Sequence, residues 1–415
     1  MRNAAALVVD HAKGEVLAWV NAHAPGEGSA YDAVTVPRQA GSTLKPFLYA
    51  LALERGWTAA TLLEDAPLRE AIGQGQHAYR NYSRSHYGSV RLRDALGNSL
   101  NIPAVRAIQF VGVADFLDRL RQLGFHGLRQ HPDYYGDGLA LGNAEVTLLE
   151  LTTAFAALAN GGEYRPLRLL RDQSPLPARA VLARPVSRLI GNILADPDAR
   201  RLEFGAGGLM QFPVETAIKT GTSSDYRDAW VLAFNHRYTV GVWLGRLDGA
   251  PMQGVSGACG AVPVARAIFA ELNRRTSPAP LPMDATLVQL MICRDSGLPA
   301  DGSCPSRPEW FLPSRWPQPS APQQAPAPLP RIRQPSRELQ LALDPRLPPE
   351  RQRFAFRLDT APAQAQVEWL VNGVSVGRGD GLLWPLQRGR HWVQARIRQQ
   401  DGAVLETAAV PFRVR

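Results

Sequence analysis

The first 275 residues combine short apolar runs, whose length predicts strands, with longer runs of helical period. Ala4–Asp10 and Glu15–Val20 are strand-like runs on either side of His11–Gly14, a pattern typical of a β-hairpin. Three later runs have the same character and are separated by tight turns: Val214–Thr222, Ala229–Asn235 and Tyr238–Gly245. The pattern therefore predicts strands near both ends of this region.

Three other segments of the region predict helices. Thr43–Arg55 follows Gly41-Ser42, and Thr147–Asn160 ends at a glycine pair, where a helix can stop. Val262–Arg275 has the apolar stripe of an amphipathic helix. The region therefore predicts a domain of mixed α and β structure.

The rest of the chain changes character twice. Residues 312–336 contain eight prolines in 25 positions, which predicts an extended spacer without a core. After it, no helical period remains, and apolar runs alternate with turns such as Asn372-Gly373 and Asp401-Gly402. The predicted strands are LQLAL, RFAFRL, QVEWLVNG, HWVQARIR and AVPFRV. They predict a small antiparallel β-sandwich.

The amino-acid composition and net charge exclude several classes of protein. With 415 residues, 45% of them hydrophobic and 20% charged, the chain is long enough for two or three domains with cores. No run reaches the ~18 apolar residues of a membrane span, and the first residues do not have the pattern of a signal peptide. The net charge of +9 is spread out without a basic block, so we expect no nucleic-acid partner.

Lysine is rare, which draws attention to each one. Of 46 basic residues only Lys13, Lys45 and Lys219 are lysines, and lysine is the basic side chain whose pKa can fall far enough for it to act as a base. Lys45 follows Ser42 by three residues, so a helix would bring amine and hydroxyl onto one face. Pro46 requires that helix to begin near Ser42. A serine at a helix N-terminus beside a neutral amine is a candidate nucleophile.

Two later segments complete a set of motifs. Lys219 begins the sequence KTGT on a predicted strand, where the missing side chain of Gly221 would let a ligand backbone approach closely. Ser99 and Asn101 offer a hydroxyl and an amide on a turn before a helix-like run. Ser-x-x-Lys, Ser-x-Asn and Lys-Thr-Gly, in this order, are the motifs of penicillin-binding proteins and class A β-lactamases.

With these motifs and their flanks, the chain resembles the transpeptidase domain of class A, bifunctional penicillin-binding proteins over most of residues 4–275. The similar stretches are GSTLKPFLYALALERG, YGSVRLRDALGNSLNIPAV, LGNAEVTLLELTTAFAALANGG and KTGTSSDYRDAWVLAFNHRYTVGVWLG. The cysteine pair Cys293 and Cys304, the spacer and the C-terminal β-domain match the 1C type. The resemblance implies an α+β fold with a five-stranded antiparallel sheet, covering helices and a helical lobe, followed by an Ig-like β-sandwich.

The resemblance also implies boundaries and a place in the cell. We expect a penicillin-binding transpeptidase domain at 1–275, a connector with the cysteine pair at 276–336 and a β-sandwich at 337–415. The bifunctional proteins begin with a membrane helix and a glycosyltransferase domain, which this sequence does not contain, so we expect a fragment, a split gene product or a wrongly assigned start. Its location would be periplasmic, with association to the inner membrane at full length.

The activity that the resemblance implies is serine D,D-transpeptidation. Ser42 would attack the D-Ala–D-Ala amide of a peptidoglycan stem peptide and form an acyl-enzyme, while Lys45 takes its proton. The catalytic residues would be Ser42, Lys45, Ser99 and Lys219, and the substrate-binding residues Asn101, Thr220, Gly221 and Thr222. The expected partners are stem peptides as donor and amine acceptor, β-lactam antibiotics, and cell-wall proteins bound through the β-domain. No metal or cofactor is expected.

Other interpretations stay open. A D,D-carboxypeptidase or β-lactamase-type hydrolase would use water as acceptor, although residues 140–165 do not contain the Glu-x-x-x-Asn loop of class A β-lactamases. A non-catalytic penicillin-binding sensor or scaffold would not cross-link. In an oxidising periplasm we prefer a disulfide between Cys293 and Cys304 to free thiols or a zinc half-site, and we expect Cys259 to be a packed core thiol.

Overall fold

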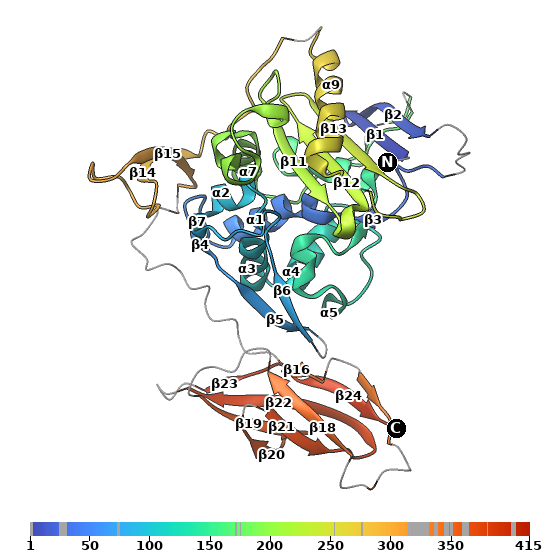
Figure 1. Cartoon of the computed structure of the whole chain (residues 1–415), viewed down its shortest axis with the longest axis vertical. Coiled ribbons are helices and arrows are strands. Elements are labelled where there is room, and N and C mark those ends of the chain that lie inside the picture. The colour runs from blue at the N-terminus through green and yellow to red at the C-terminus, as the bar shows by residue number, and fades with distance from the viewer. Residues whose placement is uncertain are drawn as a thin grey trace. The chain divides into compact units, whose positions relative to one another are not determined.

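The chain forms two compact units, shown in a computed structural model (Figure 1). One comprises residues 1–68 and 79–323, and the other comprises residues 69–78 and 324–415. None of the helices among the described residues is long and apolar enough to cross a lipid bilayer. The described residues are 3–24, 31–72, 75–170, 172–174, 176–252, 254–274, 277–313, 315, 332–335, 339–343, 348, 352–358, 365–379, 381–399 and 404–415.

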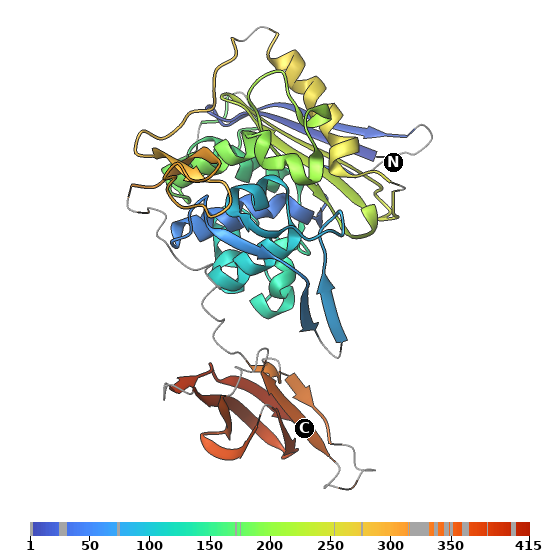
Figure 2. The same ribbon diagram turned by 60° about the vertical axis from the view of Figure 1, so that its left-hand side comes forward.

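An antiparallel sheet forms the centre of the first unit (Figures 1 and 2). Its strand order is β11-β12-β13-β1-β2, so β11 and β2 are the edge strands. The strands are β1 (Asn3–Asp10), β2 (Glu15–His23), β11 (Ala217–Thr222), β12 (Asp228–Phe234) and β13 (Tyr238–Gly245). The predicted hairpin and the three later runs supply these strands, which confirms the expected five-stranded antiparallel sheet.

Helices cover both faces of this sheet (Figures 1 and 2). Val231 of β12 belongs to an apolar cluster that includes Phe269 of α9, whereas its neighbours Trp230 and Leu232 point into the larger core shared with the other helices. Because both faces are buried, β12 is apolar at every position after its first. The covering helices are α1 (Lys45–Glu54), α6 (Leu148–Ala159), α7 (Arg184–Ala195) and α9 (Val262–Leu272).

A helical lobe and short connecting elements complete the first unit. The helices of the lobe are α2 (Leu92–Gly97), α3 (Asn101–Val111), α4 (Val113–Gln122), α5 (Pro132–Tyr135) and α8 (Arg201–Phe204). The short turns are η1 (Gly41–Leu44), η2 (Gly136–Leu141), η3 (Asp198–Arg200), η4 (Gly208–Met210), η5 (Ser224–Tyr226) and η6 (Gly257–Ala261). The short strands of this unit are β3 (Arg38–Gln39), β4 (Leu62–Asp65), β7 (Gly88–Arg91), β8 (Glu145–Val146), β9 (Glu163–Tyr164) and β10 (Arg179–Ala180). The paired strands β5 (Leu68–Ile72) and β6 (Gly75–Tyr79) lie almost wholly in residues 69–78, which belong to the second unit.

Helix boundaries follow local signals closely. A capping box between Thr147 and Glu150 starts α6, and two glycines with positive φ, Gly161 and Gly162, follow its end as predicted. The predicted helix at the end of the region is three residues shorter than expected, since α9 ends at Leu272.

The expected connector contains ordered structure. β14 (Val288–Cys293) and β15 (Ser306–Phe311) pair antiparallel, and a disulfide joins Cys293 to Cys304 in the loop between them. The preferred disulfide is therefore confirmed over free thiols and a zinc half-site. The expectation for Cys259 is wrong, because its place in the one-turn π-helix η6 leaves it exposed at the surface.

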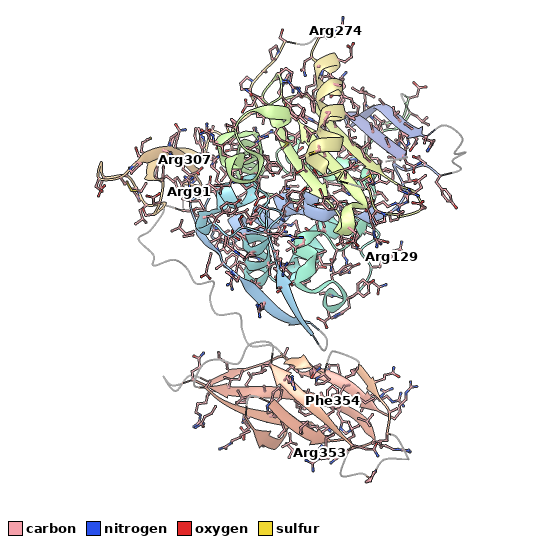
Figure 3. All side chains as sticks on the ribbon, in the orientation of Figure 1. Arg91, Arg129, Arg274, Arg307, Arg353 and Phe354 are labelled. Carbon is pink, nitrogen blue, oxygen red and sulfur yellow. A yellow bond between two sulfur atoms is a disulfide. The ribbon has the colours of Figure 1, made fainter. Side chains whose placement is uncertain are left out.

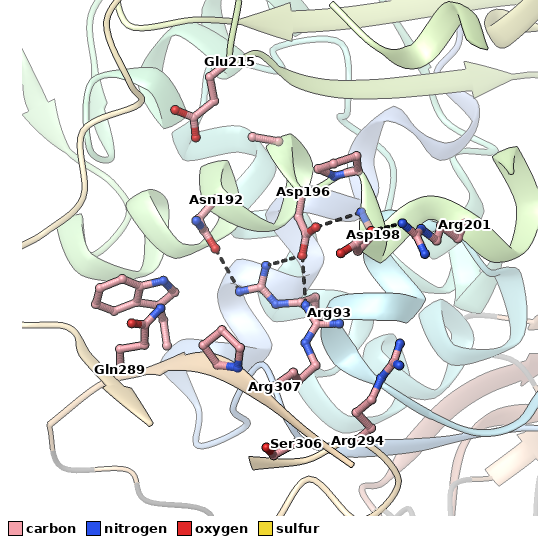
Figure 4. A pocket seen from close by; sticks show the side chains of 14 residues that line it. Arg93, Asn192, Asp196, Asp198, Arg201, Glu215, Gln289, Arg294, Ser306 and Arg307 are labelled. Atoms are coloured by element: carbon pink, nitrogen blue, oxygen red, sulfur yellow. Dashed lines mark hydrogen bonds and ion pairs between the residues drawn. The ribbon is translucent and has the colours of Figure 1, made fainter. Parts of the chain in front are cut away.

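Charged side chains join β15 to the helices around a cavity of about 640 Å³ (Figures 3 and 4). Glu309 is fully buried and accepts hydrogen bonds of 2.5–3.0 Å from the Arg93 guanidinium. Arg93 also donates to Asn192 and Asp196 of the α7 region, and Asp196 accepts a further hydrogen bond from Arg307 at 3.1 Å. Opposite charges therefore compensate one another in the wall of the cavity.

The second unit is a β-sandwich. Its core lies between two sheets and includes Phe356, Trp369, Trp384 and Phe412, whereas Trp392 is at the rim. One sheet has the order β16-β18-β21 and the other β17-β24-β22-β19-β20, with β23 paired to β22. The strands are β16 (Ile332–Gln334), β17 (Leu339–Leu341), β18 (Arg353–Leu358), β19 (Gln366–Val371), β20 (Val374–Arg378), β21 (Gly381–Pro385), β22 (Gly389–Arg398), β23 (Val404–Glu406) and β24 (Val410–Val414).

The sandwich corrects three sequence-based expectations. It is not wholly antiparallel, because β17 pairs parallel to β24. This pairing joins strands that are distant in the sequence, so no local sequence pattern predicts it. β16 lies inside the predicted spacer, and β20, β21 and β23 were not predicted. The turn at Asn372-Gly373 is confirmed, with φ of 52° and 81°. Most of the spacer, residues 316–331, and the Asp401-Gly402 turn lie outside the described residues.

Candidate functional site

Ser42 lies on a tight turn that packs directly on the end of β11. The turn is η1, a 3-10 turn that continues into α1, so the α-helix itself begins at Lys45, two residues after the predicted start at Thr43. Gly41 has φ +54°, and a Cβ there would lie 2.7–2.9 Å from backbone atoms of Thr222. Its N–H donates to Gly142 O at 3.1 Å. Only glycine permits this close approach, which holds the Ser42 turn against β11.

Gly221 makes room for another segment of the chain. A Cβ on Gly221 would lie 2.6 Å from Thr43 Cγ2 and 2.8 Å from Ala40 O. The space left by the missing side chain is therefore filled by the η1 segment of the chain. On this face of β11 the Ser42 turn therefore leaves no room for a ligand, and the approach of a ligand backbone to the edge of the strand stays a prediction.

Lys45 is completely buried and lies at the centre of the site. Its Nζ donates to Ser99 O at 2.6 Å, to Leu100 O at 3.0 Å and to Asn101 Oδ1 at 2.7 Å. These three acceptors match the three hydrogens of an ammonium group. The first two motifs are therefore in direct contact, although none of these three bonds involves Ser42.

Lys219 reaches the same turn from β11. Its Nζ donates to Ser99 Oγ at 2.7 Å and to Thr220 O at 2.8 Å, and its side chain is 2% exposed. Ser99 itself has φ +59°, a left-handed conformation that is uncommon for a residue with a side chain. Ser99 thus joins the two lysines, one through its carbonyl and the other through its hydroxyl.

The two amines are easier to deprotonate than ordinary lysines. Burial, and after it the charge of Lys219, holds the pKa of Lys45 well below its usual value, against a smaller opposing effect of Glu203. Burial alone lowers the pKa of Lys219 to about 7. The site can therefore hold at least one uncharged amine near neutral pH, which a proton acceptor requires.

Thr220 and Thr222 follow Lys219 along β11. Thr220 is 8% exposed, and Thr222 Oγ1 accepts a hydrogen bond of 3.2 Å from Gly257 N, at the start of η6. The Thr222 hydroxyl keeps its own hydrogen for donation, because it acts as the acceptor in that bond. The structure thus brings the eight predicted site residues together where the Ser42 turn, the Ser99 turn and β11 meet: Ser42, Lys45, Ser99, Asn101, Lys219, Thr220, Gly221 and Thr222.

Sequence analysis missed the residues that hold Asn101. Arg80 O accepts from Asn101 Nδ2 at 2.7 Å, and Asn81 Oδ1 accepts from Asn101 N at 2.8 Å. Asn81 in turn donates to both carboxylate oxygens of Asp65, at 2.9 and 2.8 Å. No spacing rule connects these residues to a motif, so the sequence alone had no signal for them.

Two exposed tyrosines flank the site. The rings of Tyr82 and Tyr226 meet edge to face with centroids 6.4 Å apart, and their hydroxyls are 3.5 Å apart. Tyr82 follows Asn81, whereas Tyr226 belongs to the turn after β11. Among the described residues, no group of three or more His, Cys, Asp or Glu side chains lies close enough together to hold a metal ion.

Comparison with known families agrees with this geometry. Residues 4–234 match the penicillin binding protein transpeptidase domain, and residues 319–406 match the penicillin-binding protein C-terminus family. The chain belongs to the penicillin-binding protein transpeptidase family. The resemblance inferred from the three motifs is therefore confirmed.

Relatives extend the comparison. Penicillin-binding protein 1C of Escherichia coli K12 is 35% identical over 323 residues, which are 74% of this chain and 40% of that protein. Penicillin-binding protein 1B of Vibrio cholerae is 30% identical over 273 residues, 63% of this chain and 35% of that protein. The chain thus spans less than half the length of these two relatives.

Solved structures share the fold. The crystal structure of penicillin-binding protein 1A from Haemophilus influenzae has 25% sequence identity and a TM-score of 0.67, over 76% of this chain and 54% of that one. PonA1 from Mycobacterium tuberculosis in complex with penicillin V has 19% identity and a TM-score of 0.56, over 73% of this chain and 84% of that one. The second likeness concerns the fold alone.

Proposed function

We propose that this chain carries a serine D,D-transpeptidase site that cross-links peptidoglycan stem peptides through an acyl-enzyme on Ser42. One observation carries the proposal: two buried amines, Lys45 and Lys219, meet at Ser99 beside the Ser42 turn. Burying two amines side by side costs folding free energy when they are charged, and such strongly lowered pKa values are typical of functional sites. Acyl transfer uses them, because it needs one proton acceptor and one positive group.

The first half-reaction forms the acyl-enzyme. Ser42 Oγ attacks the carbonyl carbon of the D-Ala–D-Ala amide, and its proton passes to the uncharged amine of Lys45. To accept that proton, Lys45 keeps two of its three hydrogen bonds and turns its lone pair to Ser42. As the C–N bond breaks, Ser99 gives its hydroxyl proton to the departing D-Ala amine, and the proton that Lys45 took from Ser42 passes to Ser99, so that both residues return to their starting forms.

Substrate recognition uses the end of β11. The hydroxyls of Thr220 and Thr222 bind the terminal carboxylate, and Lys219 adds positive potential there. The backbone N–H groups of Ser42 and Thr222 stabilise the developing oxyanion, each contributing ~3 kcal/mol in comparable enzymes. The packing of Gly41 on the Thr222 backbone supports this pairing.

The second half-reaction releases the enzyme. The amine of a second stem peptide attacks the acyl carbonyl, the new amide forms, and Ser42 regains its proton. A β-lactam acylates Ser42 in the same way, but its leaving group stays tethered and blocks the acceptor. The substrate places this activity in the periplasm, and cell-wall proteins remain candidate partners of the β-sandwich.

Labelling with a fluorescent penicillin tests the proposal. We expect the chain to form a covalent adduct that survives denaturation, and Ser42→Ala to abolish it without loss of folding. Label retained by Ser42→Ala would overturn the nucleophile assignment. Incubation with donor and acceptor stem peptides should then yield a cross-linked dimer.

The competing functions predict different products. Rapid release of the penicillin, or formation of free D-Ala without dimer, would indicate a hydrolase of the carboxypeptidase or β-lactamase type. A stable adduct without any peptide product would indicate a penicillin-binding sensor or scaffold. Either result would reject cross-linking as the function.

A further inference from the structure

Three consecutive residues outside the sequence motifs form a fourth element of the site. Arg80 O and Asn81 Oδ1 accept the two hydrogen bonds that Asn101 donates from its side chain and its backbone, at 2.7 and 2.8 Å. Tyr82 then contacts Tyr226 beyond the end of β11. The segment thus borders the Ser-x-Asn turn on one side and the KTGT strand on the other.

The orientation of Asn81 is set by a buried carboxylate. Asn81 Nδ2 donates to both oxygens of Asp65, and also to Ser85 O at 2.9 Å. Asp65 has no exposed surface, and Asn81 is 3% exposed. A carboxylate accepts hydrogen bonds only, so the amide nitrogen of Asn81 must face Asp65 and its oxygen must face Asn101. Tyr87 N supplies a further donor to Asp65 at 2.8 Å, which completes the pairing of this buried charge.

Asn81 provides an acceptor that α3 lacks locally. Asn101 is the first residue of α3, and the residue before it, Leu100, has no side-chain acceptor for the free N–H groups of the first turn. Asn81 Oδ1 caps that turn from twenty residues away in the sequence. The start of α3, and with it Asn101, is therefore held by a segment that no local helix signal includes.

The same contacts fix the side chain of Asn101. A carbonyl oxygen only accepts hydrogen bonds, so Asn101 must turn its amide nitrogen to Arg80 O, and its oxygen then faces Lys45, as observed. The position of Asn101 Oδ1 then determines one of the three directions in which Lys45 Nζ forms hydrogen bonds. The remaining directions decide how well the lone pair of an uncharged Lys45 can point to Ser42.

We propose that Asn81 is a positioning residue of this site, aligned by Asp65, which holds Asn101 so that Lys45 can take the proton of Ser42. The inference rests on the proposed function. It adds the pair Asp65 and Asn81 to the three motifs, as groups that act through Asn101 and do not touch the substrate.

The first test separates positioning from folding. Asn81→Ala should slow the first-order acylation step by a fluorescent penicillin about tenfold or more, while the affinity for the intact lactam stays within about threefold. Its pH profile of acylation should shift, because the hydrogen bonds around Lys45 change. The matched control is Asn235→Ala, which removes a buried asparagine that accepts backbone N–H bonds from Arg237 and Tyr238 in the β12–β13 turn. That variant should lose stability but acylate normally per folded molecule.

The second test exchanges the two groups. Asn81→Asp alone places a second carboxylate next to that of Asp65, and the two repel each other. This variant should acylate more slowly than Asn81→Ala. The double variant Asp65→Asn/Asn81→Asp re-creates a carboxylate–amide pair in reverse, with an oxygen still available to Asn101 N. It should recover most of the acylation rate that Asn81→Asp loses.

The outcomes are distinct from those of the proposed function. Labelling that Ser42→Ala abolishes supports the function first, and a chain that is never labelled overturns both proposals. If the chain is labelled through Ser42, then normal acylation by Asn81→Ala overturns the positioning role alone. A loss no larger than that of Asn235→Ala, with an unchanged pH profile, overturns it as well.

Discussion

Substituting Gly221 by alanine tests the claim that the Ser42 turn is positioned by direct packing on β11. The backbone of Gly221 has an ordinary φ, so alanine can adopt it without strain. The added methyl group would lie 2.6 Å from Thr43 Cγ2 and 2.8 Å from Ala40 O. The only perturbation is therefore steric, and it acts on the residues that flank the nucleophile.

The distances set the size of the effect. Carbon atoms pack at about 3.5–4.0 Å, so η1 and β11 must separate by about 1 Å. Overpacking of this kind costs about 1–3 kcal/mol of stability. A displacement of about 1 Å at a reacting group slows catalysis by about 10²-fold, and we expect that loss in the acylation rate of Gly221→Ala.

The assay compares the rate of labelling by a fluorescent penicillin with the melting temperature. Gly191→Ala in α7 is the matched control, because its new methyl group meets the Phe234 ring at 3.4 Å and should be tolerated. Adding Thr43→Ser to Gly221→Ala removes the nearest clashing carbon and keeps a hydroxyl for Ala40 O. This double variant should regain part of the lost rate.

A folded Gly221→Ala chain that acylates within about threefold of the unsubstituted chain would refute the argument, since a turn displaced by about 1 Å should not react normally. A rescue by Thr43→Ser that restores stability but no activity would show that the clash does not act through Ser42.

Two further predictions concern buried charges. Glu309→Gln removes the buried negative charge that pairs with the Arg93 guanidinium, and it should lower the free energy of unfolding by about 3–5 kcal/mol in urea titrations. Glu271→Gln in an exposed ion pair should change nothing measurable, and equal effects of the two variants would contradict the role of burial. Because burial lowers the pKa of Lys219 to about 7, the unfolded chain binds a proton between pH 7 and pH 10 that the folded chain has released. Lys219 should therefore contribute a rise in stability of up to ~1.4 kcal/mol per pH unit in this window, in addition to the contribution of Lys45, and Lys219→Met should make the slope shallower. Identical slopes would refute the lowered pKa of Lys219.

The close packing of η1 on β11 also explains the order of the residues in the KTGT segment. Lys219 reaches Ser99, Gly221 makes room for η1, and Thr222 lies against Gly41. Successive side chains of a strand point to opposite faces, so Lys219 and Gly221 face the Ser99 and Ser42 turns, whereas the side chains of Thr220 and Thr222 face η6. The strand thus joins the Ser42 turn and the Ser99 turn within four residues.

Much of this protein follows from local patterns in its sequence. The period of apolar residues, the glycine pair after α6 and the Asn372-Gly373 turn predicted elements correctly, because each depends on the backbone preferences of neighbouring residues. The three-residue spacing of Ser42 and Lys45 and the rarity of lysine identified the candidate site, because both can be read directly from the sequence. The order of the motifs then led to the family.

Tertiary structure decided what depends on residues distant in the sequence. Only packing shows that the side-chain position of Gly221 is filled by Thr43, that Asp65 orients Asn81 toward Asn101, and that β17 pairs parallel with β24. Such contacts join segments whose separation has no fixed period, so no pattern along the chain encodes them. Burial likewise belongs to the folded state, and it is burial that lowers the pKa values of Lys45 and Lys219.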